Sequence, residues 1–182
     1  MKPKRLFVAI DFPQSVQRFL VDLDPQIRGV RWTAAEQMHL TLGFFGDVPQ
    51  DIDAKFRERL SAIHFGAFFF LPIAGLGTFP PKGPPKIVWI GIGRGHPHLF
   101  QLHKRVTEAA LAVGLELHLR PFHPHITLAR CRDVSSQAMR KFLQANVTLD
   151  AGMVQVESFH LYSSQLTPPG SIHTRELTVS GK

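Results

Sequence analysis

The residues of this chain best suited to chemistry form one short pattern that occurs twice. The copies are His39-Leu40-Thr41-Leu42 and His125-Ile126-Thr127-Leu128, and their histidines are 86 residues apart (125 − 39) in a chain of 182. Because histidine titrates near neutral pH, one imidazole can act as a base while the other, protonated, acts as an acid. The threonine hydroxyls can bond phosphate oxygens. Such a set suits phosphoryl transfer, in which the attacking and leaving oxygens lie on opposite sides of phosphorus.

Each copy of the pattern predicts a strand. Side chains alternate along a strand, so His39 and Thr41 share one face, about 7 Å apart, while Leu40 and Leu42 enter the core. A repeat spaced at half the chain length predicts two lobes related by a pseudo-twofold axis, which would bring the four polar side chains together. The alternative is two polar strands on a solvated face, which leaves the identical residue choice in both halves unexplained.

The rest of the chain predicts strands and helices that would position these two strands. Apolar residues at helical spacing predict helices over residues 13–25, 50–63, 98–113 and 135–145. Further strands are predicted over residues 4–11, 30–32, 67–76, 87–92, 115–119, 153–163 and 174–179. A Pro-rich stretch, residues 79–86, predicts an exposed loop whose lysines either contact a polynucleotide or are simply solvated.

No flexible linker divides the chain, so we predict a single bilobal domain over residues 1–182. We expect the α+β class, with two pseudo-symmetric lobes, each having an antiparallel sheet and flanking helices, around a central cleft.

Composition favours an anionic partner in a reducing compartment. The net charge is +7 and the isoelectric point about 10.1, which favours nucleic acid without identifying it. Cys131 is the only cysteine, so no intrachain disulfide is expected and the cytoplasm is the natural setting. The apolar run from Leu6 to Ile10 stops at Asp11, too short for a signal peptide or a membrane span.

The two strands and their flanks resemble a known family. The stretches Arg5-Leu6-Phe7-Val8-Ala9-Ile10-Asp11, His39-Leu40-Thr41-Leu42-Gly43-Phe44-Phe45-Gly46 and Pro121-Phe122-His123-Pro124-His125-Ile126-Thr127-Leu128-Ala129-Arg130 resemble the two-histidine phosphoesterases. More narrowly, they are similar to the RNA 2',3'-cyclic phosphodiesterases, also called 2'-5' RNA ligases. The resemblance continues to Leu161-Tyr162-Ser163-Ser164 and thus covers nearly the whole chain.

This resemblance implies metal-free hydrolysis of a terminal 2',3'-cyclic phosphate to a 2'-phosphate, without a cofactor. His39, Thr41, His125 and Thr127 would be catalytic, with His39 as the acid and His125 as the base. The partners would be RNA ends that carry the cyclic phosphate, tRNA fragments among them. The protein would be a monomer that does not bind membranes.

Four further residues are candidate substrate contacts. Arg130 matches the family's phosphate-side arginine, yet it lies five residues beyond His125, which on an ideal strand would turn it to the opposite face unless the strand ends or bulges. The alternative is a surface arginine. Phe7, Phe44 and Tyr162 could stack on a terminal base, although aromatics at such positions are more often core residues.

Other chemistries have weaker support in the sequence. A zinc site would draw on His96, His98, His103, His123 and His125, whose spacing is poor for converging ligands. Cys131 as a nucleophile would need its own base and oxyanion site. Neither a P-loop nor a dinucleotide-binding glycine motif occurs. Two rival functions stay open, reversible 2'-5' ligation and a non-catalytic RNA-binding module.

Overall fold

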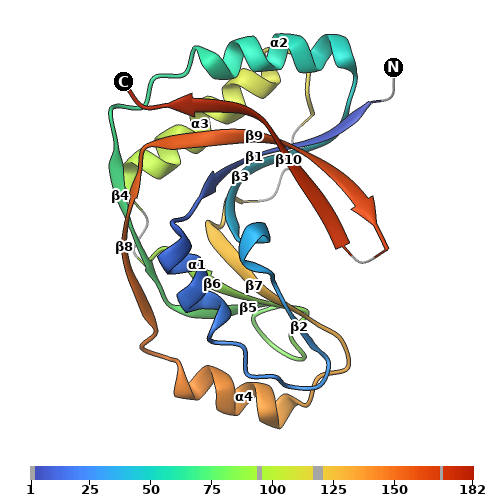
Figure 1. Ribbon diagram of the computed structural model, residues 1–182, viewed down its shortest axis with the longest axis vertical. Coiled ribbons are helices and arrows are strands. Elements are labelled where there is room, and N and C mark those ends of the chain that lie inside the picture. The colour runs from blue at the N-terminus through green and yellow to red at the C-terminus, as the bar shows by residue number, and fades with distance from the viewer. Residues whose placement is uncertain (1–2, 94–95, 117–120, 169) are drawn as a thin grey trace.

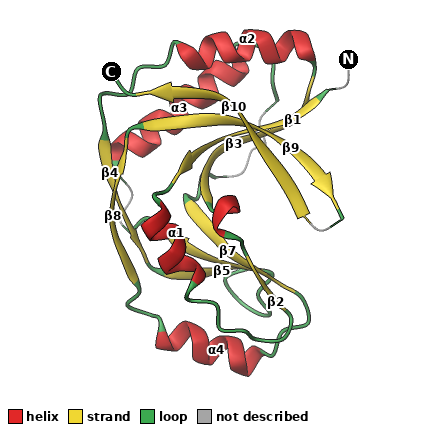
Figure 2. Ribbon diagram, viewed as in Figure 1, coloured by secondary structure: helices red, strands yellow, loops and turns green. Residues whose placement is uncertain are grey.

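Two antiparallel sheets and four α-helices form the fold in the computed structural model, which describes residues 3–93, 96–116, 121–168 and 170–182 (Figures 1 and 2). The larger sheet has the strand order β10-β9-β1-β3-β7-β6-β5, with β2 also paired to β7, and the smaller sheet pairs β4 with β8. The strands are β1 (Lys4–Asp11), β2 (Val30–Trp32), β3 (His39–Val48), β4 (Phe69–Ala74), β5 (Leu76–Phe79), β6 (Ile87–Gly91), β7 (His125–Cys131), β8 (Asp150–Val156), β9 (Ser158–Thr167) and β10 (Gly170–Ser180). The helices are α1 (Gln14–Val21), α2 (Gln50–Ser61), α3 (Pro97–Leu111) and α4 (Ser136–Ala145), with a short 3-10 helix η1 (Ala35–Gln37) before β3.

The larger sheet runs through both halves of the molecule. We call β1, β3, β9 and β10 the upper half and β2, β5, β6 and β7 the lower half, as they lie in Figure 1. The halves meet where β3 pairs with β7 through one residue pair, Leu40 with Ile126. The predicted α+β class is confirmed. The strands of each half are antiparallel, as expected for each lobe, and the pairing of the two central strands joins the halves into one sheet.

Helices cover the sheet at both ends of the molecule. α2 and α3 pack at the upper half, and α4 lies below the lower half (Figure 1). Leu40, Leu42 and Ile126 are fully or almost fully buried in the main core, as the alternation predicted. Under the lower half, Met139 of α4 packs with Val88 and other apolar residues in a second, smaller core. The polar faces of β3 and β7 are therefore turned away from the main core.

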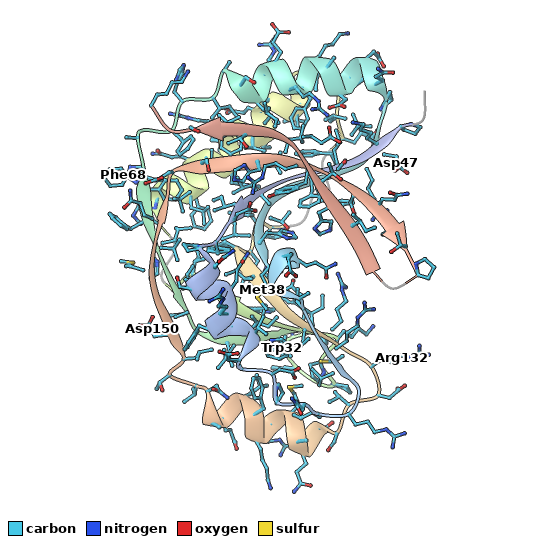
Figure 3. The ribbon with its side chains drawn as sticks, in the orientation of Figure 1. Trp32, Met38, Asp47, Phe68, Arg132 and Asp150 are labelled. Carbon is cyan, nitrogen blue, oxygen red and sulfur yellow. The ribbon has the colours of Figure 1, made fainter. Side chains whose placement is uncertain are left out.

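Two predicted strands are each divided in the structure. Residues 67–76 contain β4 and the start of β5, separated by Gly75, whose φ of 84° favours glycine. Residues 153–163 contain parts of β8 and β9. β8 pairs with β4 to form a two-stranded arm, and β9 continues into the upper half. Phe68 and Asp150 mark opposite ends of the arm (Figure 3). The predicted strand at 115–119 falls mostly outside the described residues. Helix α1 ends at Val21, before the expected stop near Pro25.

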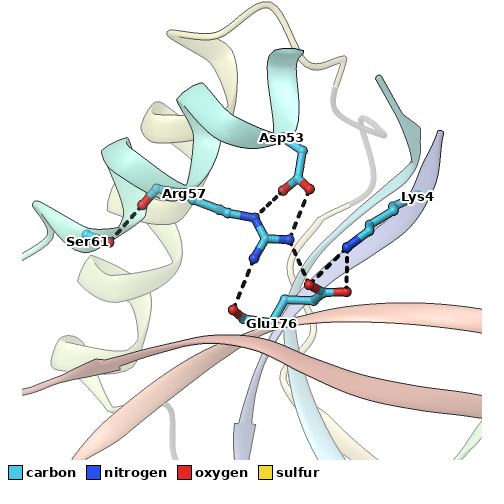
Figure 4. Close-up of polar contacts among 5 residues, drawn as sticks. All are labelled: Lys4, Asp53, Arg57, Ser61 and Glu176. Atoms are coloured by element: carbon cyan, nitrogen blue, oxygen red, sulfur yellow. Dashed lines mark hydrogen bonds and ion pairs between the residues drawn. The ribbon is translucent and has the colours of Figure 1, made fainter. Parts of the chain in front are cut away.

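An ion-pair network fastens α2 to the upper half (Figure 4). The Arg57 guanidinium donates to both carboxylate oxygens of Asp53, at 2.7 and 3.0 Å, and to the Glu176 carboxylate at 2.9 Å. Lys4 of β1 donates to the same Glu176 carboxylate at 2.9 Å. Glu176 is the residue that a β-bulge inserts into β10, between the paired positions Arg175 and Leu177. The bulge thus positions the carboxylate that links three elements.

Candidate active site

All four predicted catalytic side chains line one cleft of about 410 Å³. His39 and Thr41 come from β3, and His125 and Thr127 come from β7. Six of the described lining residues are basic or histidine, and none is Asp or Glu: Arg5, Arg31, His39, His125, Arg130 and His173. Such a lining favours an anionic ligand.

The pairing of β3 with β7 sets how the two motifs face each other. Leu40 lies opposite Ile126 in an antiparallel pair. Extending this register by one residue each way sets His39 beside Thr127 and His125 beside Thr41. Each histidine therefore has the threonine of the other motif as its neighbour.

A backbone hydrogen bond fixes the His125 ring. Its Nδ1 lies 2.6 Å from the carbonyl oxygen of His123, and because a carbonyl only accepts, Nδ1 must carry the proton. In the neutral ring this leaves Nε2 with a free lone pair, the form required of a base. Burial lowers the pKa of His125, while the bond to His123 opposes that shift. The ring is therefore neutral at pH 7.

His39 is enclosed more tightly than His125. Its ring centroid lies 5.0 Å from that of Phe7 and 5.4 Å from that of His173, and it hydrogen-bonds the backbone of Gln37, again two residues earlier in the chain. Burial and the neighbouring His173 lower the pKa of His39 to about 4. The free protein therefore carries a neutral imidazole at this position near neutral pH.

Two of the three expected base-stacking aromatics support His39. Phe7 is only 4% exposed, because Tyr162 stacks on it at 5.2 Å and His39 packs against it. Tyr162 does not line the cleft, and its hydroxyl donates to the Asp11 carboxylate at 2.6 Å. Burial and this bond raise the pKa of Tyr162 to about 12. Phe7 nevertheless contributes to the cleft lining, and base stacking by these two residues stays a prediction.

β-Bulges bring the other two candidate contacts into the cleft. In the β1–β3 pairing, Val8 faces Gly43 and Ala9 faces Thr41, so Leu42 is an inserted residue. In the β6–β7 pairing, Leu128 is inserted in the same way. Side chains alternate between the two faces of a strand, and each inserted residue shifts this alternation by one position. A residue five positions after a histidine then points to the same face as the histidine. Phe44 and Arg130, each five residues after a motif histidine, therefore lie on the histidine face and line the cleft.

Several residues that line the cleft were not predicted from the sequence. Arg5 lies over the Phe44 ring at 4.8 Å, and Arg31 comes from β2. The β9–β10 hairpin closes the cleft from the upper side and contributes Leu166 and His173. Gln37 of η1 donates to the Ser171 carbonyl at 2.7 Å and so ties the hairpin to the residues just before β3. No local motif marks these residues, because strand pairing over long sequence separations brings them together.

The alternative chemistries gain no support from the geometry. Within the described ranges, no three His, Cys, Asp or Glu side chains converge as a metal site would require. Cys131 is absent from the cleft lining, and burial raises the pKa of its thiol, which disfavours the nucleophilic thiolate. Among the helices of the described residues, none is long and apolar enough to cross a membrane.

Comparison with known proteins identifies the family. An RNA 2',3'-cyclic phosphodiesterase of Aeropyrum pernix is 35% identical over 139 residues, which cover 76% of this chain and 78% of that protein. One of Archaeoglobus fulgidus is 31% identical over 175 residues, covering 93% and 96%. The crystal structure of Escherichia coli LigT complexed with 3'-AMP superimposes with a TM-score of 0.82 at 26% identity, over 98% of each chain. Residues 12–167 match the family model of the 2'-5' RNA ligase superfamily, and the chain belongs to that superfamily.

Proposed function

We propose that this protein is an RNA 2',3'-cyclic phosphodiesterase that opens a terminal cyclic phosphate to a 2'-phosphate by general acid–base catalysis. One observation carries the proposal: two His-x-Thr pairs lie side by side on the paired strands β3 and β7, in a cleft whose described lining has three arginines and no carboxylate. The relatives named above are RNA 2',3'-cyclic phosphodiesterases, which supports the same substrate class.

In the proposed reaction, the two histidines act on opposite sides of phosphorus. His125 takes a proton from water through Nε2 as the water oxygen bonds to phosphorus. The bond from phosphorus to O3' breaks, and His39 gives its proton to O3', which leaves the phosphate on O2'. Thr41 and Thr127 donate to the non-bridging oxygens, and Arg130 stabilises the charge that develops there.

The acid role requires that substrate binding protonate His39. Its pKa of about 4 in the free protein disfavours the imidazolium at neutral pH, with burial as the main cause. A phosphodiester anion beside the ring opposes this shift, since a nearby negative charge favours the charged form of histidine. We therefore propose that the substrate itself raises the pKa of the acid.

Turnover of a dinucleotide with a 2',3'-cyclic phosphate end, measured in EDTA, tests the proposal. We expect a 2'-phosphate product, and loss of at least about 10²-fold in turnover for either His39→Ala or His125→Ala. His64→Ala, at an exposed position, is the matched control and should keep full activity. A protein that binds this RNA without turnover would be the non-catalytic module, and activity lost in EDTA but restored by zinc or manganese would contradict the metal-free reaction.

A substrate with sulfur in place of O3' separates the roles of the histidines. Because a thiolate leaves without protonation, His39→Ala should regain activity on this substrate while His125→Ala should not. Recovery in His125→Ala alone would reverse the assignment. A 3'-phosphate product from the ordinary substrate would contradict the proposed orientation of the cyclic phosphate.

The same acid–base pair would also support ligation in the 2'-5' sense, with a ribose hydroxyl in place of water. The family to which the chain belongs motivates this second candidate. Adding an RNA with a free 5' hydroxyl to the assay tests it, because a joined product appears only if that hydroxyl competes with water.

We further propose that the protein is a monomer that acts on RNA ends, tRNA fragments among them. We also propose that it acts in the cytoplasm, in keeping with the single cysteine, Cys131.

A further inference from the structure

Arg31 and Arg130 lie directly opposite each other on neighbouring strands. The antiparallel pairing of β2 with β7 makes them Cα partners, and both line the cleft. Like charges at directly opposed positions destabilise a sheet. Both side chains are exposed, and no described acidic residue lines the same cleft. An anion that lies between or beside the two guanidinium groups would offset this repulsion.

The position of this pair relative to the histidines suggests which anion. The Leu128 bulge absorbs one residue, so Arg130 is one side-chain position beyond Thr127 on the same face, about 7 Å along the strand. The cleft volume of about 410 Å³ suits a ligand about the size of one nucleotide. An RNA chain held by its terminal nucleotide must therefore leave the cleft, and its next phosphate is an anion close to the first.

The β9–β10 hairpin leaves space for Arg31 at this end of the cleft. At Gly170, near the start of β10, an added Cβ atom would lie 3.2 Å from a terminal guanidinium nitrogen of Arg31. The backbone there also has a φ of 155°, which glycine adopts readily. A bare backbone thus lets the guanidinium approach the hairpin, and Leu166, an exposed apolar residue, lines the cleft on the same hairpin. The arginine is therefore on the rim and accessible to a chain that leaves the cleft.

We propose that Arg31, beside Arg130, binds the phosphodiester that precedes the terminal nucleotide, and that this contact makes the protein prefer RNA chains to mononucleotides. The inference rests on the proposed function, since it places the reacting phosphate between His39 and His125. Arg130 serves the reacting phosphate, and Arg31 serves the next one.

Three substrates test the proposal: a nucleoside 2',3'-cyclic phosphate, a dinucleotide ending in the same group, and that dinucleotide with an uncharged methylphosphonate linkage. Arg31→Gln should lower kcat/KM for the charged dinucleotide about tenfold, mainly through KM, because it removes one charge-assisted contact. It should leave the mononucleotide unchanged. Arg28→Gln, an exposed arginine outside the described cleft lining, is the matched control and should leave all three substrates unchanged. Arg130→Ala should lower turnover of all three.

The dinucleotide with the uncharged linkage supplies a second test. The wild-type protein should lose the same factor on the methylphosphonate dinucleotide, and Arg31→Gln should add no further loss there. The slope of log kcat/KM against log salt for the charged dinucleotide should also fall by about 1 in Arg31→Gln. Equal losses of Arg31→Gln on all substrates, or equal wild-type rates on both linkages, would overturn the inference. Absence of wild-type turnover on every substrate would overturn the proposed function instead.

Discussion

At the scale of single residues, the side chains around His39 set the pKa of its imidazole. Four aromatic or imidazole rings form a continuous group in which Phe7 contacts His39, Tyr162 and His173, and His173 also contacts His39. The group buries one side of His39 and sets a second histidine beside it. In the mechanism proposed above, this environment would keep His39 neutral until the anionic substrate arrives, which would tie its protonation to substrate binding.

The first prediction concerns His173→Gln. Replacing His173 removes a like charge beside His39, so the pKa of His39 should rise from about 4. Titration of the His39 ring followed by NMR measures the change directly, and the acidic limb of kcat/KM against pH should move to higher pH with it. His64→Gln, an exposed histidine outside the described cleft lining, is the control. An unchanged His39 titration in His173→Gln would contradict the coupling of the two rings.

At the scale of elements, helix α3 holds both motif strands in place through His103. Its Nδ1 donates to the carbonyl of Leu42, the inserted residue of β3, at 2.8 Å. Its ring stacks on Phe122 with centroids 3.8 Å apart and planes 6° apart. Phe122 directly precedes His123, whose carbonyl orients His125. One side chain thus contacts the bulge that turns Phe44 into the cleft and the segment that leads to the second motif.

The second prediction separates these two contacts. His103→Asn keeps a donor near the Nδ1 position but loses the stack, whereas His103→Phe keeps the stack but leaves the Leu42 carbonyl without this donor. We expect His103→Phe to lower kcat about tenfold with a small change in KM, because a displaced bulge moves Phe44 and Thr41. His103→Asn should restore much of that loss. Measured kcat and KM alongside thermal unfolding midpoints check this; parallel losses of activity and stability in both variants would indicate a purely structural residue.

Much of the element order could be predicted from the sequence, since helical spacing and strand alternation reflect local contacts. The two motif strands and their four catalytic candidates also follow from local pattern. The division between β8 and β9 had a signal in the sequence. The alternating apolar residues, which are buried in the structure, fall at the even positions Val154 and Val156 in β8 and at the odd positions Phe159 and Leu161 in β9. The bulges at Leu42 and Leu128 had none, because an inserted residue is defined only by its partner strand. The contribution of His173 was invisible for the same reason, since pairing of β9 with β10 places it.

At the scale of the whole molecule, the network around Glu176 joins α2, β1 and β10 (Figure 4). Burial raises the pKa of this carboxyl, but hydrogen bonds from Ser163, Lys4 and Arg57 outweigh it and lower the pKa to about 2. Asp53 is buried and depends on Arg57 for its charge balance. The network therefore stabilises the packing of α2 against β1 and β10.

The third prediction is that Glu176→Gln lowers the free energy of unfolding at pH 7 by about 1 to 3 kcal/mol, the scale of charge-assisted hydrogen bonds. A carboxyl whose folded pKa is depressed stabilises the fold above its unfolded pKa, here 4.5, and loses that contribution as the pH falls toward 2. The difference between wild type and variant should therefore shrink between pH 4.5 and 2. Urea unfolding at several pH values measures it, with Glu157→Gln, an exposed glutamate, as the control. A difference that stays constant with pH would contradict the assignment.

The order of the strands in the larger sheet determines which truncated versions of the protein can be expressed as folded domains. The family match covers residues 12–167, and a clone with those boundaries would lack β1, which lies between β9 and β3, together with all of β10. It would lose Arg5, Phe7 and His173 from the cleft, and Lys4 and Glu176 from the network around α2. The remaining β3 and β9 would present unpaired edges rich in apolar residues, which favour aggregation. Recombinant pieces should therefore keep residues 4–180, and an affinity tag at either end should be joined through a spacer so that β1 and β10 can pair.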